Sequence, residues 1–79
     1  MAKKGSIVDK QEFLAGGYYA KEQYEGLLVK ADPRSGNLQI GVELDDDRVM
    51  VVDEATDRNI RERIQSWAPQ VEEIRRRHR

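Results

Sequence analysis

The 79-residue sequence has no cysteine and only one histidine, His78, next to the end of the chain. Without cysteine the chain can form neither disulfide bonds nor thiolate metal sites. A catalytic nucleophile needs a base within hydrogen-bond reach. The serines are the candidate nucleophiles, and the single histidine near the chain end is not expected to serve any of them as a base. The glycines also lack the spacing of a phosphate-binding loop. We therefore expect no metal, no cofactor, no small-molecule substrate and no enzyme activity.

Long apolar runs are also missing. No stretch approaches the roughly 20 apolar residues that cross a bilayer, and residues 1–13 contain no apolar run of signal-peptide length. We therefore expect a cytoplasmic protein without membrane contact. A single core in a chain below about 80 residues seldom supplies more than about 3–5 kcal/mol. Because disulfides and metals are excluded, self-association is the remaining source of extra stability.

The net charge of −1 conceals an uneven distribution along the chain. Residues 1–21 carry four lysines and two acids, a net +2. Residues 22–57 carry ten acids and three basic residues, a net −7, whereas residues 58–79 carry seven arginines and three glutamates, a net +4. These opposite charges could be balanced within the chain, between two copies, or by a charged partner.

The clearest strand signal lies in residues 38–53. Apolar side chains at every second position indicate a strand with one buried face: they are Leu38, Ile40, Val42 and Leu44. The apolar run 49–52 then predicts a partner strand. Three consecutive aspartates, residues 45–47, lie between the two runs and predict the turn of a hairpin, because aspartate readily caps its own backbone. In so short a turn they cannot all converge on one Ca²⁺ or Mg²⁺ ion, so we expect no metal site there.

A third strand is predicted for residues 24–31, which a strong turn signal at residues 32–37 separates from the hairpin. The sequence thus predicts an α+β fold with a three- to five-stranded antiparallel meander over residues 24–53; closure into an SH3-like barrel is the alternative. Two of these strands are apolar on both faces, so both faces of the sheet need a cover. One helix covers one face. The N-terminal segment, barrel closure or a second subunit could cover the other.

The N-terminal part gives weaker signals. Residues 1–6 indicate a flexible start. Asp9 and Glu12 have the spacing of a capping box, which predicts a short helix over residues 10–15. The two residues before Asp9 could form a short strand or pack as a staple, and a glycine pair ends the helix. Whether residues 7–19 as a whole are helical or extended stays open.

Three tyrosines, Tyr18, Tyr19 and Tyr24, lie close together in the sequence. They could form an aromatic platform that stacks on a nucleobase or encloses a methylated amine. Adjacent residues of a strand point to opposite faces, however, so Tyr18 and Tyr19 cannot both join one platform. We expect the three rings to lean on the edge of the core, with their hydroxyl groups in water.

The C-terminal part predicts a helix over residues 56–77, opened by Thr56 and by Asp57 in its first turn. Apolar residues recur every three or four positions and form one stripe: they are Ile60, Ile64, Trp67, Val71 and Ile74. Pro69 removes a backbone donor and clashes with the preceding turn. We therefore expect the helix to be bent or broken near Pro69, with its first piece lying on the sheet.

These features predict one domain over residues 1–79, a small non-enzymatic interaction module of regulatory or adaptor type that self-associates as a homodimer. The predicted contact residues lie on the second helical piece, which offers apolar and basic side chains: Val71, Ile74, Arg75, Arg76, Arg77 and Arg79. The alternative is a nucleic-acid-binding regulator, because guanidinium groups suit phosphate, although the pI near 5.8 argues against it. In a third hypothesis the acids of residues 45–57 face a basic protein partner.

Overall fold

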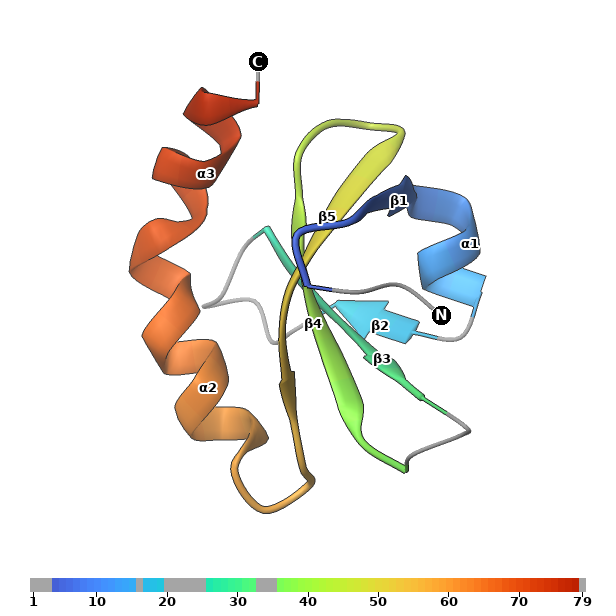
Figure 1. Ribbon diagram of the computed structural model, residues 1–79, viewed down its shortest axis with the longest axis vertical. Coiled ribbons are helices and arrows are strands. Elements are labelled where there is room, and N and C mark those ends of the chain that lie inside the picture. The colour runs from blue at the N-terminus through green and yellow to red at the C-terminus, as the bar shows by residue number, and fades with distance from the viewer. Residues whose placement is uncertain (1–3, 16, 20–25, 33–35, 79) are drawn as a thin grey trace.

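The computed structural model describes residues 4–15, 17–19, 26–32 and 36–78, except for the side chains of residues 17–19. Within them, five strands form one antiparallel sheet, with helices on both faces (Figure 1). The strands are β1 (Ile7–Asp9), β2 (Gly17–Tyr19), β3 (Leu27–Ala31), β4 (Leu38–Glu43) and β5 (Arg48–Ala55). The helices are α1 (Lys10–Ala15), α2 (Ile60–Trp67) and α3 (Val71–Arg77), and the 3₁₀ turn η2 (Ala68–Gln70) joins the last two. The predicted α+β fold is confirmed.

The order of the strands is β1-β5-β4-β3-β2. The predicted meander forms its centre, because β3 pairs antiparallel with β4 and β4 with β5. The short strands β1 and β2 extend it at the two edges. Over the part of the chain that the structure describes, these edge strands do not pair with each other, so the sheet stays open. Helices cover its two faces, and the alternative of an SH3-like barrel is not realised.

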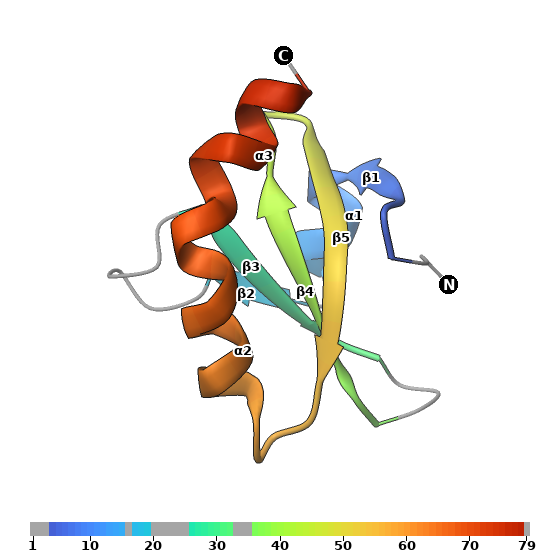
Figure 2. The same ribbon diagram turned by 60° about the vertical axis from the view of Figure 1, so that its left-hand side comes forward.

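The larger part of the core lies between the sheet and the unit formed by α2, η2 and α3, here called the helical unit. Figure 2 shows this unit running along one face of the sheet while α1 lies behind it. The predicted apolar stripe packs onto alternate residues of the strands. The buried members of this core are Leu27, Val29, Ile40, Val42, Val52, Ala55, Ile64, Val71 and Ile74.

The second face of the sheet is covered by the N-terminal segment. Phe13 of α1 is 2% exposed and packs with Leu28, Val49 and Val51, which point away from the helical unit. A Cβ atom at Gly41 would clash with Cγ1 of Val49 and would lie 3.1 Å from the Cζ atom of Phe13, so glycine makes room for both side chains. Of the three covers that the two-faced strands allow, the chain uses its own N-terminal segment.

The N-terminal segment is more ordered than the sequence predicts. The amide of Gly5 donates a hydrogen bond of 2.6 Å to the carbonyl oxygen of Val51. The amide of Val51 in turn donates a hydrogen bond of 2.9 Å to the carbonyl oxygen of Ser6. Part of the predicted flexible start therefore extends the pairing of β1 with β5. The predicted cap is confirmed, because the amide of Glu12 donates to Oδ2 of Asp9 at 3.1 Å and α1 follows directly.

The C-terminal helix begins later than predicted, at Ile60 instead of Thr56. The Oδ1 atom of Asn59 accepts a hydrogen bond of 2.7 Å from the amide of Thr56, and this contact holds a turn where the helix was expected to start. The predicted break near Pro69 is confirmed. Pro69 lies in η2, one 3₁₀ turn between α2 and α3, where its missing N–H costs no α-helical hydrogen bond.

Candidate functional site

The structure places the predicted contact residues in different surroundings. Val71 and Ile74 are 3% and 7% exposed and lie in the core beneath α3. This corrects the place predicted for them, because the fold leaves neither side chain free to contact a partner. The reason is that η2 continues the chain along the same path, so the apolar stripe stays on the sheet beyond Pro69.

Arg75 is also held by the fold. Its Nε atom donates to the carbonyl oxygen of Glu43 at 2.7 Å, and its Nη2 atom lies 3.5 Å from Oε1 of the same residue. Its Nη1 atom lies 3.3 Å from the carboxylate of Glu72. The side chain crosses the backbone at Gly26, where an added Cβ atom would lie 2.9 Å from Nη2. Arg75 therefore fastens α3 to the end of β4.

Arg76 and Arg77 point into solvent, with side chains 72% and 71% exposed. Among the described residues, both reach only Glu73, at 3.7 and 3.4 Å, in pairs along the helix surface. Such exposed pairs contribute little to stability, so the fold does not depend strongly on them. Arg79 lies outside the described residues.

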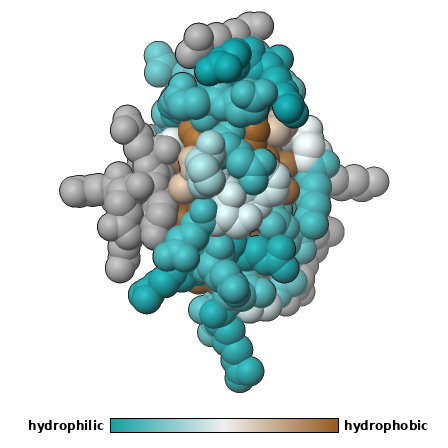
Figure 3. All heavy atoms as spheres, turned by 90° about the vertical axis from the view of Figure 1, so that its left-hand side faces the viewer, coloured by the Kyte–Doolittle hydropathy of each residue, from teal (hydrophilic) through white to brown (hydrophobic). Residues whose placement is uncertain are grey.

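Two further arginines near the start of the helical unit, Arg58 and Arg61, are exposed. Among the residues that the structure places, neither has an ion-pair partner within 4.0 Å. Figure 3 looks onto the outer side of the helical unit and shows hydrophilic side chains in its upper and lower parts, with pale atoms of intermediate hydropathy and brown, hydrophobic atoms between them. At the break, Ser66, Pro69 and Gln70 are exposed and uncharged.

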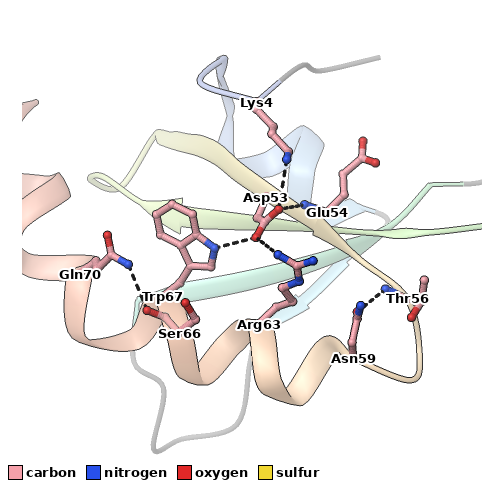
Figure 4. Close-up of polar contacts among 9 residues, drawn as sticks. All are labelled: Lys4, Asp53, Glu54, Thr56, Asn59, Arg63, Ser66, Trp67 and Gln70. Atoms are coloured by element: carbon pink, nitrogen blue, oxygen red, sulfur yellow. Dashed lines mark hydrogen bonds and ion pairs between the residues drawn. The ribbon is translucent and has the colours of Figure 1, made fainter.

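The carboxylate of Asp53 contacts four groups from three parts of the chain (Figure 4). Its Oδ2 atom accepts a hydrogen bond of 2.9 Å from the indole Nε1 of Trp67 and lies 3.4 Å from Nη1 of Arg63. Its Oδ1 atom accepts the amide of Glu54 at 2.8 Å and lies 3.3 Å from Nζ of Lys4. Asp53 thereby connects β5 to α2 and to the N-terminal segment.

A β-bulge turns Asp53 toward the helical unit. The pairing of β4 with β5 runs from Gly41 opposite Val51 to Ile40 opposite Asp53, so Val52 is an extra residue in β5. Opposite residues of antiparallel strands share a face, and Ile40 lies in the core beneath the helical unit. Asp53 therefore lies on that side too.

The surroundings of Asp53 keep it ionised. Burial opposes the charged form, but the hydrogen bonds from Trp67, the amide of Glu54 and Lys4 outweigh it, and the pKa of Asp53 lies below its ordinary value of 3.8. A catalytic acid or base needs a pKa near the working pH. The donors around Asp53 shift its pKa in the opposite direction and occupy its oxygens.

A second carboxylate, that of Glu43 at the end of β4, also joins two parts of the molecule. Its Oε2 atom lies 2.8 Å from Nζ of Lys10 in α1, and its Oε1 atom lies 3.5 Å from Nη2 of Arg75 in α3. All three side chains are between 15% and 22% exposed. Asp53 and Glu43 thus each bind one lysine from the N-terminal segment and one or more donors from the helical unit.

The three aspartates behave as the predicted turn. The Oδ1 atom of Asp45 accepts the amides of Asp47 and Arg48, each at 2.9 Å, and its Oδ2 atom lies 2.8 Å from Nε of Arg48. The hydrogen bond from the Asp47 amide and the contacts with Arg48 hold the pKa of Asp45 below its ordinary value. Among the described residues, no group of three or more histidine, cysteine or acidic side chains is placed to hold a metal ion.

The aromatic platform considered for the three tyrosines falls outside the described side chains. Asp53 and Glu43 were missed because each lies within an apolar strand, where the sequence shows a charged residue and not its partners. The only available signal was an acid inside a strand that is otherwise buried. No family model, no curated protein and no solved structure matches the chain. Of the helices described, none has the length and apolar character to cross a membrane.

Proposed function

We propose that the protein is a small non-enzymatic interaction module that pairs with a second copy of itself through the outer side of the helical unit. The observation that carries the proposal is the order of charges along this side. Each end bears both signs, and the middle is uncharged. The α2 end has Asp57, Arg58, Arg61 and Glu62, and the α3 end has Glu72, Glu73, Arg76 and Arg77.

Such an order is self-complementary. In a two-fold symmetric dimer the same surface of both copies is in contact, so antiparallel helical units bring the α2 end of one copy to the α3 end of the other. Arginines of each end then meet acids of the opposite end. The uncharged break around Pro69 lies near the axis, which fits an interface with a less polar centre and a charged rim.

Self-association is therefore proposed for a different reason from the one that the sequence suggested. The two-faced strands of the sheet need no second subunit, because Phe13 and its neighbours cover the second face. What supports pairing is the outer side of the helical unit, where Arg76 and Arg77 contact, of the described acids, only Glu73 in exposed pairs. The surroundings of Asp53 support a role without catalysis, because its oxygens are occupied by structural donors.

Sedimentation velocity over a wide range of concentration tests the proposal. The wild-type protein should dimerise, and the double variant R76Q/R77Q should dimerise about tenfold more weakly, a loss of about 1.4 kcal/mol. The control Q11E/A15E makes the same change in net charge on the exposed side of α1 and should associate like the wild type. A wild-type protein that stays monomeric throughout would reject the proposal.

Charge reversal gives the test a sharper form. The variant R76E/R77E should lose self-association because like charges then face one another. Mixing it with a second variant, D57R/E62R, should restore pairing between the two different copies, because the reversed ends complement each other. Failure of the mixture to pair, with both variants folded, would contradict the antiparallel arrangement.

Nucleic-acid binding is the second candidate, and the exposure of Arg76 and Arg77 favours it. Guanidinium groups bind phosphate with two parallel hydrogen bonds. The acids interleaved with these arginines oppose it, since they would face the same polyanion. Fluorescence anisotropy with labelled duplex and single-stranded DNA and RNA distinguishes the two. A nucleic-acid contact should weaken by roughly one decade per decade of salt for each phosphate neutralised, and R76Q/R77Q should reduce that slope.

A further inference from the structure

We infer that residues 4–15, here called the N-terminal strap, form a separately releasable cover of the sheet, and that Asp53 and Glu43 couple its docking to that of the helical unit. This conformational device does not depend on the proposed self-association. The strap comprises β1 and α1, with the two preceding residues Gly5 and Ser6 and the anchoring Lys4.

The strap has fewer buried contacts than the helical unit. Among the described residues, the strap contributes one buried side chain, Phe13, with Val8 and Leu14 partly buried beside it. The helical unit contributes three buried side chains, those of Ile64, Val71 and Ile74. A helix of six residues is far below the roughly 12–15 residues at which an isolated helix becomes marginally stable in water. α1 therefore depends entirely on its contacts with the sheet.

Backbone pairing holds the strap along one edge strand. β1 has three residues, and its partner β5 is paired on the other side with the longer strand β4. Local openings are drawn from regions with few buried apolar contacts. When the strap detaches, β3, β4 and β5 keep their mutual pairing and the core beneath the helical unit stays intact. The side chains that become exposed are Leu28, Val49 and Val51.

The two carboxylates connect this opening to the opposite layer. Asp53 binds Lys4 of the strap and Trp67 of the helical unit, while Glu43 binds Lys10 of the strap and Arg75 of the helical unit. Each carboxylate is held in place by groups from both layers. Removing one therefore loosens both layers directly, whereas removing a single lysine loosens the strap directly and the helical unit only through the carboxylate that the two layers share.

Hydrogen exchange measured by NMR on the full chain tests the release. Amides of α1 should be protected at least about tenfold less than amides shared between β3 and β4. The amide of Val51, which donates to Ser6, should exchange with the strap although it belongs to β5. Equal free energies of exchange for strap and sheet would show one cooperative unit and would overturn the inference.

Variants separate the anchor from the coupling. F13A should speed exchange in α1 by about a hundredfold or more and leave the β3–β4 amides unchanged, while Q11A on the exposed side of the same helix should change neither. E43Q should speed exchange in both α1 and α3 by about three- to tenfold, and K10M should speed exchange in α1 by a similar factor and in α3 by a smaller one. An effect of E43Q on one layer alone would refute the coupling, and a loss of β3–β4 protection in F13A would refute the separate release.

Discussion

The indole Nε1 of Trp67 donates a hydrogen bond of 2.9 Å to Oδ2 of Asp53, and this contact fastens α2 to β5. Trp67 is partly buried and packs against the core beneath the helical unit. Asp53 is 7% exposed as a residue. Substitutions at these two residues therefore measure how much this one hydrogen bond contributes to the stability of the fold.

Trp67→Phe keeps most of the aromatic packing and removes the donor. We expect it to lower the free energy of unfolding by about 1–2 kcal/mol, because one hydrogen bond to a charged acceptor is lost. Asp53→Ala should cost more, about 2–4 kcal/mol, since it leaves several donors without their acceptor. Urea denaturation at pH 7 measures both. Ser66→Ala is the control, because the side chain of Ser66 is exposed and only its carbonyl oxygen accepts a hydrogen bond; equal losses for all three variants would contradict the role of the pair.

Part of the free energy of unfolding that the protein loses in acid should come from Asp53, and this part should be absent in Asp53→Asn. The pKa of Asp53 in the folded protein is below the ordinary 3.8 of the unfolded chain. The unfolded chain therefore takes up a proton first as the pH falls. The stabilisation is present in full above 3.8 and is lost as the pH falls through the folded pKa.

The measurement is the difference in unfolding free energy between wild type and Asp53→Asn as a function of pH. Other acids, including Asp45 with its lowered pKa, titrate in both proteins and cancel in the difference. The difference should be constant above pH 3.8 and shrink below it. A difference that grows as the pH falls would mean that the folded protein favours the protonated form of Asp53.

The local features of the fold were predictable because their signals lie within a few residues. The cap formed by Asp9, the turn formed by Asp45 and the break at Pro69 each depend on one side chain acting on its own backbone neighbours. The apolar period also placed β4, β5 and the helical stripe on the correct elements. Predictions of this kind need no knowledge of the rest of the chain.

The missed features depend on contacts between distant residues. Strict alternation along β5 would place Asp53 beside Val51, on the side of α1, and only the bulge at Val52 turns it toward Trp67. The start of the helix was misplaced because Asn59 captures the amide of Thr56. Exposure of the arginines was equally hidden, since Arg75 and Arg76 are neighbours in sequence yet only Arg75 reaches Glu43.

Ile74→Ala distinguishes a core residue of α3 from a contact residue. We expect a loss of about 2–5 kcal/mol in the free energy of unfolding, because the buried side chain leaves a cavity. The neighbouring Arg76→Ala should change stability by less than about 0.5 kcal/mol, as is usual for exposed positions. Both are measured by urea denaturation at a fixed protein concentration. Unchanged stability in Ile74→Ala would mean that Ile74 lies at the surface, where the sequence predicted a contact with a partner.

Gly26 and Gly36 form a matched pair for testing how closely α3 approaches the sheet. Both have positive φ angles, +90° and +75°, so alanine at either position carries backbone strain of about 1–2 kcal/mol. Among the described residues, Gly36 has no neighbour within 4 Å of an added Cβ atom, whereas at Gly26 that atom would lie 2.7 Å from Cγ1 of Val71. Gly26→Ala should therefore cost about 1–3 kcal/mol more than Gly36→Ala, because the helix must move or the side chains must shift.

A double-mutant cycle identifies the source of that extra cost. Val71→Ala removes the Cγ1 atom that the new methyl group would meet, so the double variant of Gly26 and Val71 should be more stable than the sum of the single losses predicts. The same cycle between Gly36 and Val71 should be additive within about 0.5 kcal/mol, since the two do not touch. Additivity in both cycles would mean that α3 does not press on Gly26, and that the strain of the positive φ angle alone accounts for the loss.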